Sequence, residues 1–166
     1  MQLELTSTEE IVNDEEVTVW RIVRNGGQED IILNGLFRDG ISECSWLDEE
    51  RKLISVFYVD WDGNEVYAMV NSAGEILRKG ITMIEDVVAD EQLFIIQVTG
   101  LGLGDEASDY GLHSDNLRMA VVNRDGEFVI SPEYERIRYE EDEKLFYADT
   151  ALKGECKFGI DGKTIS

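Results

Sequence analysis

The segment YAMVNSAGEIL (residues 67–77) returns 52 residues later as MAVVNRDGEFV (residues 119–129). The shorter segment DEQLF (residues 90–94) returns at the same offset as DEKLF (residues 142–146). A repeated unit of this size cannot bury its apolar face alone and packs against copies of itself. The internal likeness therefore predicts an array of similar units, without predicting an activity.

Each copy has the pattern of two short strands joined by a tight turn. Apolar residues alternate before the turns that end at Gly74 and Gly126, where glycine accommodates a positive φ angle. A shorter copy, KFGIDGKTI (residues 157–165), closes the chain, and VWRIVRNGGQEDIIL (residues 19–33) has the same order of features. We expect an all-β fold of degenerate antiparallel β-hairpins, stacked as a solenoid or as a propeller-like array.

The chain has the length of one domain, and Pro132 is its only proline. Because no Ser/Gly-rich or Pro-rich linker interrupts residues 17–166, we expect a single domain over residues 1–166. Its repeat-like units are predicted at about 17–57, 58–98, 117–148 and 149–166, with an inserted loop at 100–116. At the start of the chain, Thr6 to Glu10 could cap at most one short helix over Ile11 and Val12, or form a frayed strand.

Acidic residues dominate the charge. The sequence has 36 Asp and Glu against 15 Lys and Arg, a formal net charge of −21. This charge opposes nucleic acid, anionic lipid and phosphorylated substrates, and it favours a basic protein partner. The beginning of the chain lacks the pattern of a signal peptide, and no stretch approaches a membrane span, so we expect a cytoplasmic protein.

The inserted loop is the predicted partner-binding segment, because loops carried on a regular scaffold are frequent sites of function. Its acidic residues surround an aromatic residue that could serve as an anchor, and a second acidic group follows near residue 140. The predicted partner-binding residues are Asp105, Glu106, Asp109, Tyr110, Asp115, Glu140, Glu141 and Asp142.

Several motifs superficially suggest chemistry. His113, Ser114 and Asp115 are consecutive, and consecutive side chains diverge, so we expect an exposed turn and no catalytic triad. The glycines at 100, 102 and 104 lack a helix-starting pattern or a following Lys, which favours a flexible loop over a phosphate site. Asp60 to Glu65 partly matches a calcium loop, but Asn71 stands where a bidentate Glu is needed, so a tight turn is the better interpretation.

The remaining candidates also favour structural roles. Cys44 and Cys156 have neither metal spacing nor the density of a disulfide scaffold, so we expect buried thiols. Trp20, Trp46 and Trp61 are expected in the core and not as sugar-stacking platforms. Acidic residues recur before the strands at 48–50, 90–91 and 142–143, where solvated turns are expected. The sequence predicts no catalytic residue, metal site or cofactor.

The run RMAVVNRDGEFVISPEYERI (residues 118–137) resembles a WG repeat, a bacterial module in which a Trp-Gly pair opens a strand and a Pro-x-Tyr segment ends the unit. Met119-Ala120 takes the place of the Trp-Gly pair, Asn123 to Gly126 form the turn, and Val129 to Tyr134 form the trailing segment. Tyr67-Ala68 and Phe158-Gly159 would open neighbouring copies. The resemblance implies an all-β array of stacked hairpins in a family linked mostly to binding.

We therefore expect a non-enzymatic binding protein whose acidic surface meets a basic macromolecule. One concrete form is an immunity protein that covers the cationic active site of a nuclease-type toxin. The alternatives are a carboxylate-based hydrolase, with or without calcium, and a repeat scaffold without a dedicated partner. The oligomeric state stays open.

Overall fold

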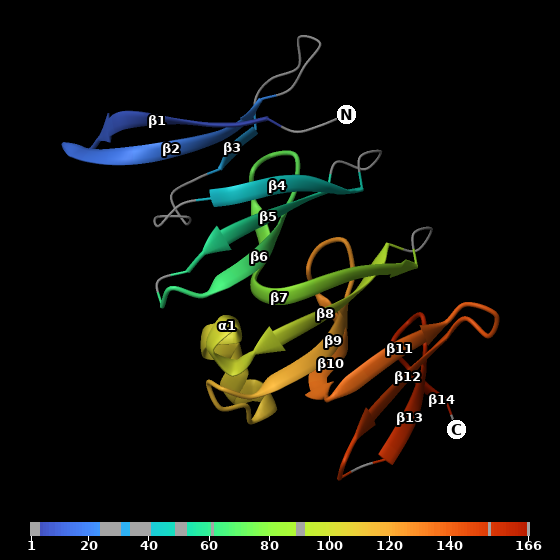
Figure 1. Cartoon of the computed structure of the whole chain (residues 1–166). Helices are drawn as coiled ribbons and strands as arrows, with labels where there is room; N and C mark the ends of the chain where they lie inside the picture. Colours follow the sequence, from blue (N-terminus) through green and yellow to red (C-terminus); the bar gives the residue numbers. More distant parts are fainter. Residues whose placement is uncertain are drawn as a thin grey trace. The chain divides into compact units, whose positions relative to one another are not determined.

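The computed structural model describes residues 4–23, 31–33, 41–48, 53–60, 62–88, 92–152 and 154–165. Its elements are β1 (Glu4–Val12), β2 (Glu15–Val23), β3 (Ile31–Leu33), β4 (Ile41–Asp48), β5 (Leu53–Val59), β6 (Glu65–Val70), β7 (Ile76–Val88), β8 (Leu93–Thr99), α1 (Gly100–Leu103), the 3-10 helix η1 (Gly104–Tyr110), β9 (Leu117–Val122), β10 (Phe128–Tyr134), β11 (Arg136–Glu140), β12 (Leu145–Thr150), β13 (Gly154–Gly159) and β14 (Thr164–Ile165) (Figure 1). Most of the described residues lie in strands of antiparallel sheets, which confirms the predicted β class. No helix in the described ranges is long and apolar enough to cross a membrane.

The chain divides into two compact units, where a single domain over 1–166 was expected. Unit 1 is Met1–Lys79 and unit 2 is Gly80–Ser166. In unit 1, β1, β2 and β3 form one sheet, and β4, β5 and β6 are neighbours in another. The core of this unit joins both sheets, because Ile22 and Leu33 pack in the same apolar cluster as Ile54, Val56 and Val70.

Unit 2 also contains two groups of strands. The strands β7 to β10 are neighbours in chain order, and β11, β12, β13 and β14 form a second sheet. Phe146 and Ile137 of the second sheet pack in one apolar cluster with Ile95, Val121 and Ile130 of the first group. This shared cluster holds unit 2 together as one core.

The strand pairing recurs in both units. The paired residues Ile54 and Val70, Phe94 and Val122, and Phe146 and Phe158 occupy the same place in the pairs β5–β6, β8–β9 and β12–β13. In each case the second residue directly precedes a turn. The likeness between distant parts of the sequence therefore corresponds to the same local pairing.

The hairpins β4–β5 and β7–β8 also share their irregularities. The first has register shifts between Ile41 and Glu43 and between Trp46 and Asp48. The second has them 40 residues later, between Ile81 and Met83 and between Asp86 and Val88. Bulges of this kind increase the local twist of a hairpin, so the two hairpins share their distortions as well as their pairing.

Four turns in the described residues have the same geometry. They begin at Asp60, Asn71, Asn123 and Gly159, and in each the first residue donates its N–H to the carbonyl four residues on, at 2.9 to 3.1 Å. The glycine at the fourth position has a φ angle of 78° to 81°. This left-handed conformation explains the glycine, and it confirms the turns predicted at these places.

The side chain of the first residue reinforces these turns. Asn123 Oδ1 accepts the N–H groups of Asp125 at 2.9 Å and Glu127 at 3.0 Å, and Asn71 makes the equivalent pair of contacts. Gly159 has no such side chain, and there Asp161 Oδ1 accepts the N–H of Lys163 instead. The amide and carboxylate side chains thus replace water at the open end of the turn.

The N-terminal segment is a strand, which is one of the two alternatives expected from the sequence, and the alternative of a short helix over Ile11 and Val12 does not occur. β1 pairs with β2 along its whole length, and Asn13 and Asp14 form the two-residue turn between them. Both have positive φ angles, 52° and 66°, as a type I′ hairpin turn requires. Asn and Asp tolerate that conformation better than other non-glycine residues, which is why the chain turns here.

Candidate functional site

The inserted segment 100–116 begins with a capped helix. The side-chain oxygen of Thr99 accepts the N–H of Gly102 at 2.9 Å and caps α1, and η1 follows directly. The expectation of a loop without a helix start is therefore wrong. A single threonine at the end of β8 provides the cap, and this signal was present in the sequence.

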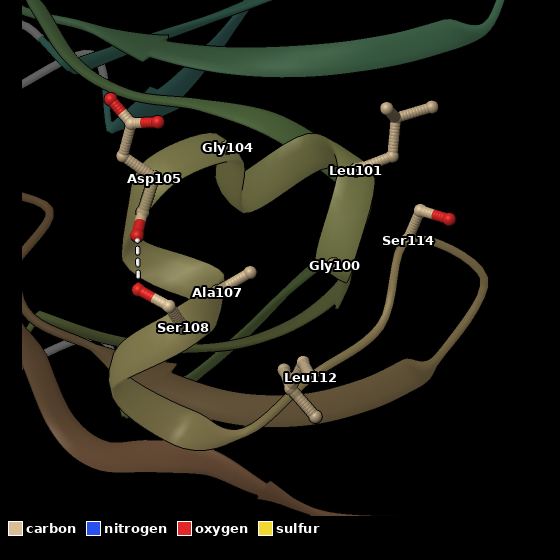
Figure 2. Close-up of a pocket in the computed structure, with 8 residues that line it drawn as sticks. All are labelled: Gly100, Leu101, Gly104, Asp105, Ala107, Ser108, Leu112 and Ser114. Carbon is tan, nitrogen blue, oxygen red and sulfur yellow. Dashed lines mark hydrogen bonds between the residues drawn. The ribbon is translucent and has the colours of Figure 1, made fainter.

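Backbone hydrogen bonds join the two ends of residues 100–116, so that the segment forms a closed loop, which we call the ring. Leu101 donates its N–H to the Ser114 carbonyl at 3.0 Å, and Gly100 donates to the Asn116 carbonyl at 3.1 Å. A Cβ atom on Gly100 would lie 1.9 Å from the His113 carbonyl oxygen, so only glycine fits there. The glycines that suggested a loop permit a close return of the chain upon itself (Figure 2).

Tyr110, at the end of η1, packs against strand β10 of unit 2. The aromatic ring of Tyr110 packs edge-on against that of Phe128, with ring centroids 5.6 Å apart, and the Tyr110 side chain is half-buried. Such aromatic pairs add to the stability gained by burial alone. The predicted partner-binding Tyr110 therefore has a packing role within the unit.

Residues of this segment line an open pocket of about 490 Å³. Its lining contains the apolar side chains of Leu101, Ala107 and Leu112 and the polar ones of Asp105, Ser108 and Ser114. Figure 2 shows the Ala107 methyl group inside the ring and the Asp105 carboxylate on its outer side. The pocket lining is therefore mixed, with three apolar side chains next to serine hydroxyls and one carboxylate.

The carboxylates of the insertion are exposed. Asp105, Asp109 and Asp115 make no side-chain hydrogen bond or ion pair with any residue that the structure describes, and Glu106 is exposed as well. Residues 100–116 include no Lys or Arg. Asp105, Asp109 and Asp115 thus form a group of exposed carboxylates without a partner among the described residues, on one short stretch of chain.

His113, Ser114 and Asp115 are exposed at the turn that closes the ring. The backbone N–H of His113 donates to Asn116 Oδ1 at 2.8 Å, and its carbonyl accepts the N–H of Asn116. These contacts form a turn, as expected for consecutive residues that cannot converge.

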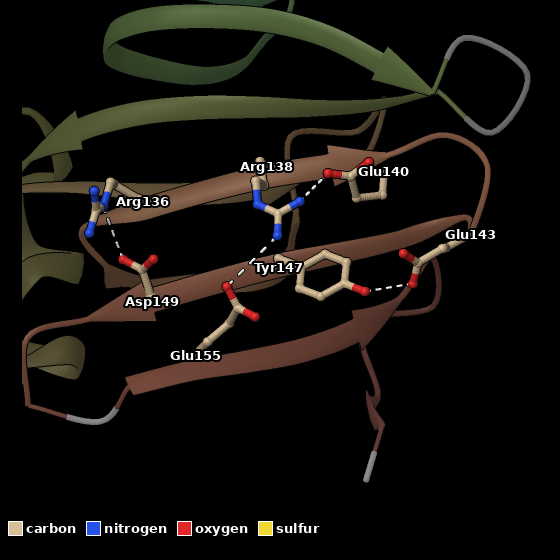
Figure 3. A network of polar contacts seen from close by, with 7 residues as sticks. All are labelled: Arg136, Arg138, Glu140, Glu143, Tyr147, Asp149 and Glu155. Atoms are coloured by element: carbon tan, nitrogen blue, oxygen red, sulfur yellow. Dashed lines mark hydrogen bonds and ion pairs between the residues drawn. The ribbon is translucent and has the colours of Figure 1, made fainter.

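The second predicted group lies on the β11–β12 hairpin, where cations accompany it (Figure 3). Glu140 is paired with Arg138, and Arg138 also lies 3.8 Å from a carboxylate oxygen of Glu155. Glu141 and Asp142 are exposed in the turn. This group is therefore partly neutralised within the sheet.

Tyr147 lies at the centre of this polar face. Its hydroxyl donates to the Glu143 carboxylate at 2.5 Å, and the Arg138 guanidinium stands 4.2 Å from its ring centroid. The hydrogen bond to Glu143, followed by burial and the charge of Glu143, raises the pKa of Tyr147 above its usual value, although Arg138 opposes the shift. The face is a network of mutual contacts across β11, β12 and β13.

The two predicted groups lie on different elements of unit 2. The insertion follows β8 and packs on β10 through Tyr110, whereas residues 140–142 occupy the tip of the β11–β12 hairpin. Figure 1 shows these two places well apart. They therefore form two acidic surfaces and not one.

The calcium-like segment is a turn. Asp60 Oδ1 accepts the N–H groups of Asp62 at 3.0 Å and Asn64 at 2.8 Å, so its carboxylate closes the backbone. In the described ranges, no group of three or more His, Cys, Asp or Glu side chains could hold a metal ion. Of the acidic turns before strands, 49–50 and 90–91 lie outside the described residues, and 142–143 form an exposed turn.

The tryptophans and cysteines have structural environments. Trp20 and Trp46 pack against the core of unit 1, as predicted, and Trp61 lies outside the described residues. Cys44 and Cys156 are free and half-buried. Burial, and then the charge of Glu43, raises the pKa of the Cys44 thiol to about 12, so this thiol stays protonated at neutral pH.

Comparisons with known proteins found no counterpart. No protein-family model matches the chain, and no curated protein or solved structure shows significant similarity to it.

Proposed function

We propose that this chain is a non-enzymatic binding protein whose insertion, residues 100–116, meets a basic protein. The exposure of three carboxylates in the insertion, together with their lack of a partner in the described residues, supports this proposal most directly. Asp105, Asp109 and Asp115 are exposed and have no hydrogen-bonding or ionic partner in the described part of the chain. A cationic partner would supply the charges that the segment itself lacks.

The charge of the whole chain supports the same partner. The net charge of −21 attracts a basic protein over a distance limited by salt, and it repels nucleic acid and anionic lipid. Unit 2 carries more than half of this net charge, because residues 80–166 have 19 acidic and 8 basic side chains, a net charge of −11. Association should therefore be fast at low salt and slower at high salt.

The insertion is a better candidate than the β11–β12 turn. At that turn, Arg138 already pairs with Glu140, and Glu143 accepts the Tyr147 hydroxyl. Glu141 and Asp142 would add a secondary charged surface. Exposed ion pairs within the protein contribute little to stability, but they reduce the charge that a partner meets.

The finer proposal is an immunity protein for a nuclease-type toxin. A nuclease binds phosphates and therefore has a cationic active site, which an acidic protein can cover. We also propose that the hairpins stack as a WG-repeat-like solenoid or propeller-like array. The recurring register and the shared turn geometry support this arrangement.

A capture experiment with matched variants tests the binding proposal. The immobilised protein is exposed to nuclease-treated host extract and washed at rising salt, and the retained proteins are identified by mass spectrometry. The test variant neutralises the insertion: D105N, E106Q, D109N and D115N. The control neutralises four other exposed acids of unit 2: D125N, E127Q, E133Q and E135Q.

Both variants lose the same amount of charge. We expect the wild type and the control to retain a basic protein that salt releases, and the insertion variant to lose most of it. Equal loss in both variants would attribute the attraction to net charge alone. No salt-sensitive basic protein on the wild type would contradict the proposal.

A further inference from the structure

We infer that the pocket of the insertion receives an apolar side chain of the basic partner, from a segment in which Lys or Arg residues flank that side chain. This inference rests on the proposed function, and it specifies which kind of segment the partner presents. The pocket and the exposed carboxylates belong to the same residues, 100–114 for the pocket lining and 105–115 for the acids.

The apolar part of the pocket lining favours an apolar group. Leu101 lines the pocket and is 45% exposed, and Leu112, which also lines it, is half-buried. Ala107, which is 7% exposed, presents its methyl group to the same space. Covering these side chains would remove apolar surface from water, and a buried leucine or methionine of the partner would gain most from this.

The surroundings of the pocket identify the rest of the segment by charge complementarity. Asp105 lines the pocket, with its carboxylate directed away from the centre of the ring, and Asp109 and Asp115 are exposed on the same segment. A chain that places an apolar residue in the pocket therefore lies next to Asp105, and Asp109 and Asp115 of the same segment add to the negative charge that it meets. Basic residues at the flanking positions are attracted, and acidic or phosphorylated ones are repelled.

Other occupants fit the charges less well. A second copy of this chain carries the same acidic insertion and the same net negative charge, so like charges would oppose its approach. An uncharged apolar molecule would use the pocket but none of the carboxylates. The basic segment is the occupant that uses both features.

Defined peptides test the inference. The probes are three fluorescent peptides, KKLKKLKK, its counterpart KKAKKAKK and the acidic peptide EELEELEE. Their dissociation constants are measured by fluorescence anisotropy at low and at physiological salt. On the wild type, we expect the leucine peptide to bind about tenfold more tightly than the alanine peptide, and the acidic peptide not to bind.

Substitutions in the protein test whether the preference for the leucine peptide over the alanine peptide arises at the pocket. L101Q should reduce the preference for leucine to about threefold or less, because it places an amide on the pocket. L152Q makes the same change at a leucine that is 97% exposed outside the pocket, and it should leave the preference unchanged. L101M keeps an apolar side chain at the pocket and should retain the preference, which separates loss of contact from loss of folding.

The outcomes separate the two proposals. Salt-dependent binding of both basic peptides with equal affinity would overturn the pocket inference and leave the proposed function standing. Binding of EELEELEE as tight as that of KKLKKLKK would show apolar capture without charge selection, and would also overturn it. Absence of binding by both basic peptides at low salt would contradict the proposed function itself.

Discussion

Gly80 and Gly102 approach each other backbone to backbone within unit 2. A Cβ atom on Gly102 would lie 2.3 Å from the Gly80 carbonyl oxygen, and one on Gly80 would lie 2.2 Å from the Gly102 carbonyl oxygen. Gly80 also has a φ angle of 70°. Strand β7 at Gly80 and helix α1 at Gly102 can therefore come this close only because neither residue has a side chain.

We expect G102A to destabilise the protein by about 2 kcal/mol or more, because the new methyl group collides with backbone that cannot move aside. The control is G111A. Gly111 has a positive φ angle of 65° but open space around it, so the substitution should cost only about 1 kcal/mol. Urea unfolding followed by far-ultraviolet circular dichroism gives both values. A G102A variant no less stable than G111A would contradict the close approach.

The recurrent turns predict equal effects at distant positions. N71A and N123A each remove a side chain that accepts two backbone N–H groups, so each should lower the free energy of unfolding by about 1 to 2 kcal/mol. N123D should keep most of the stability, because Asp60 performs the same role in its own turn. The control S72A changes an exposed turn residue and should have little effect. Unequal losses at Asn71 and Asn123 would mean that the two turns are not equivalent in solution.

Lys144 has a left-handed backbone, with a φ angle of 57°, immediately before β12. We expect K144G to stabilise the protein by up to about 1 kcal/mol, since relief of about 1 to 2 kcal/mol exceeds the entropy that glycine loses on folding. K144V should be destabilising, because a β-branched residue tolerates this conformation poorly. Thermal unfolding of the two variants tests the geometry, and a K144G variant less stable than K144V would contradict it.

The Cys44 thiol provides a test at alkaline pH. Burial and Glu43 raise its pKa from 9.0 to about 12, so the folded protein keeps the thiol neutral while the unfolded chain ionises near pH 9. Its contribution to stability is therefore complete below pH 9 and is lost as the pH rises towards 12. In a C156S background, we expect reaction with a disulfide reagent at pH 9 to be on the order of 100-fold slower in the folded protein than in urea. Similar rates in both states would contradict the burial of this thiol.

The β class and the positions of the turns could be predicted from the sequence, because the residues of each turn specify its conformation locally. Asn71, Asn123 and the glycines three positions after them specify the turn by hydrogen bonding and by φ, without help from distant residues. The N-terminal hairpin was missed because Asn13 and Asp14 fit both a helix end and a hairpin turn. Pairing with β2 decides between them, and pairing is a tertiary property.

The insertion was predicted in position and charge but not in conformation. Glycines at 100 and 102 weaken a helix intrinsically, and the chain adopts one because Thr99 caps it and Gly80 lies against it. The role of Tyr110 was also hidden, since its neighbour Phe128 is distant in sequence. The sequence alone does not distinguish the charge of residues 105–115 from that of residues 140–142, because the ion pair between Arg138 and Glu140 depends on the positions of their side chains on β11.

Hydrogen exchange measured with and without a bound basic partner, or with KKLKKLKK as the probe, tests the central claim most directly. The account predicts slowed exchange of backbone amides in residues 100–116, and no comparable change in the turns at 71–75 and 123–127. Protection at the β11–β12 hairpin with none in the insertion would contradict it.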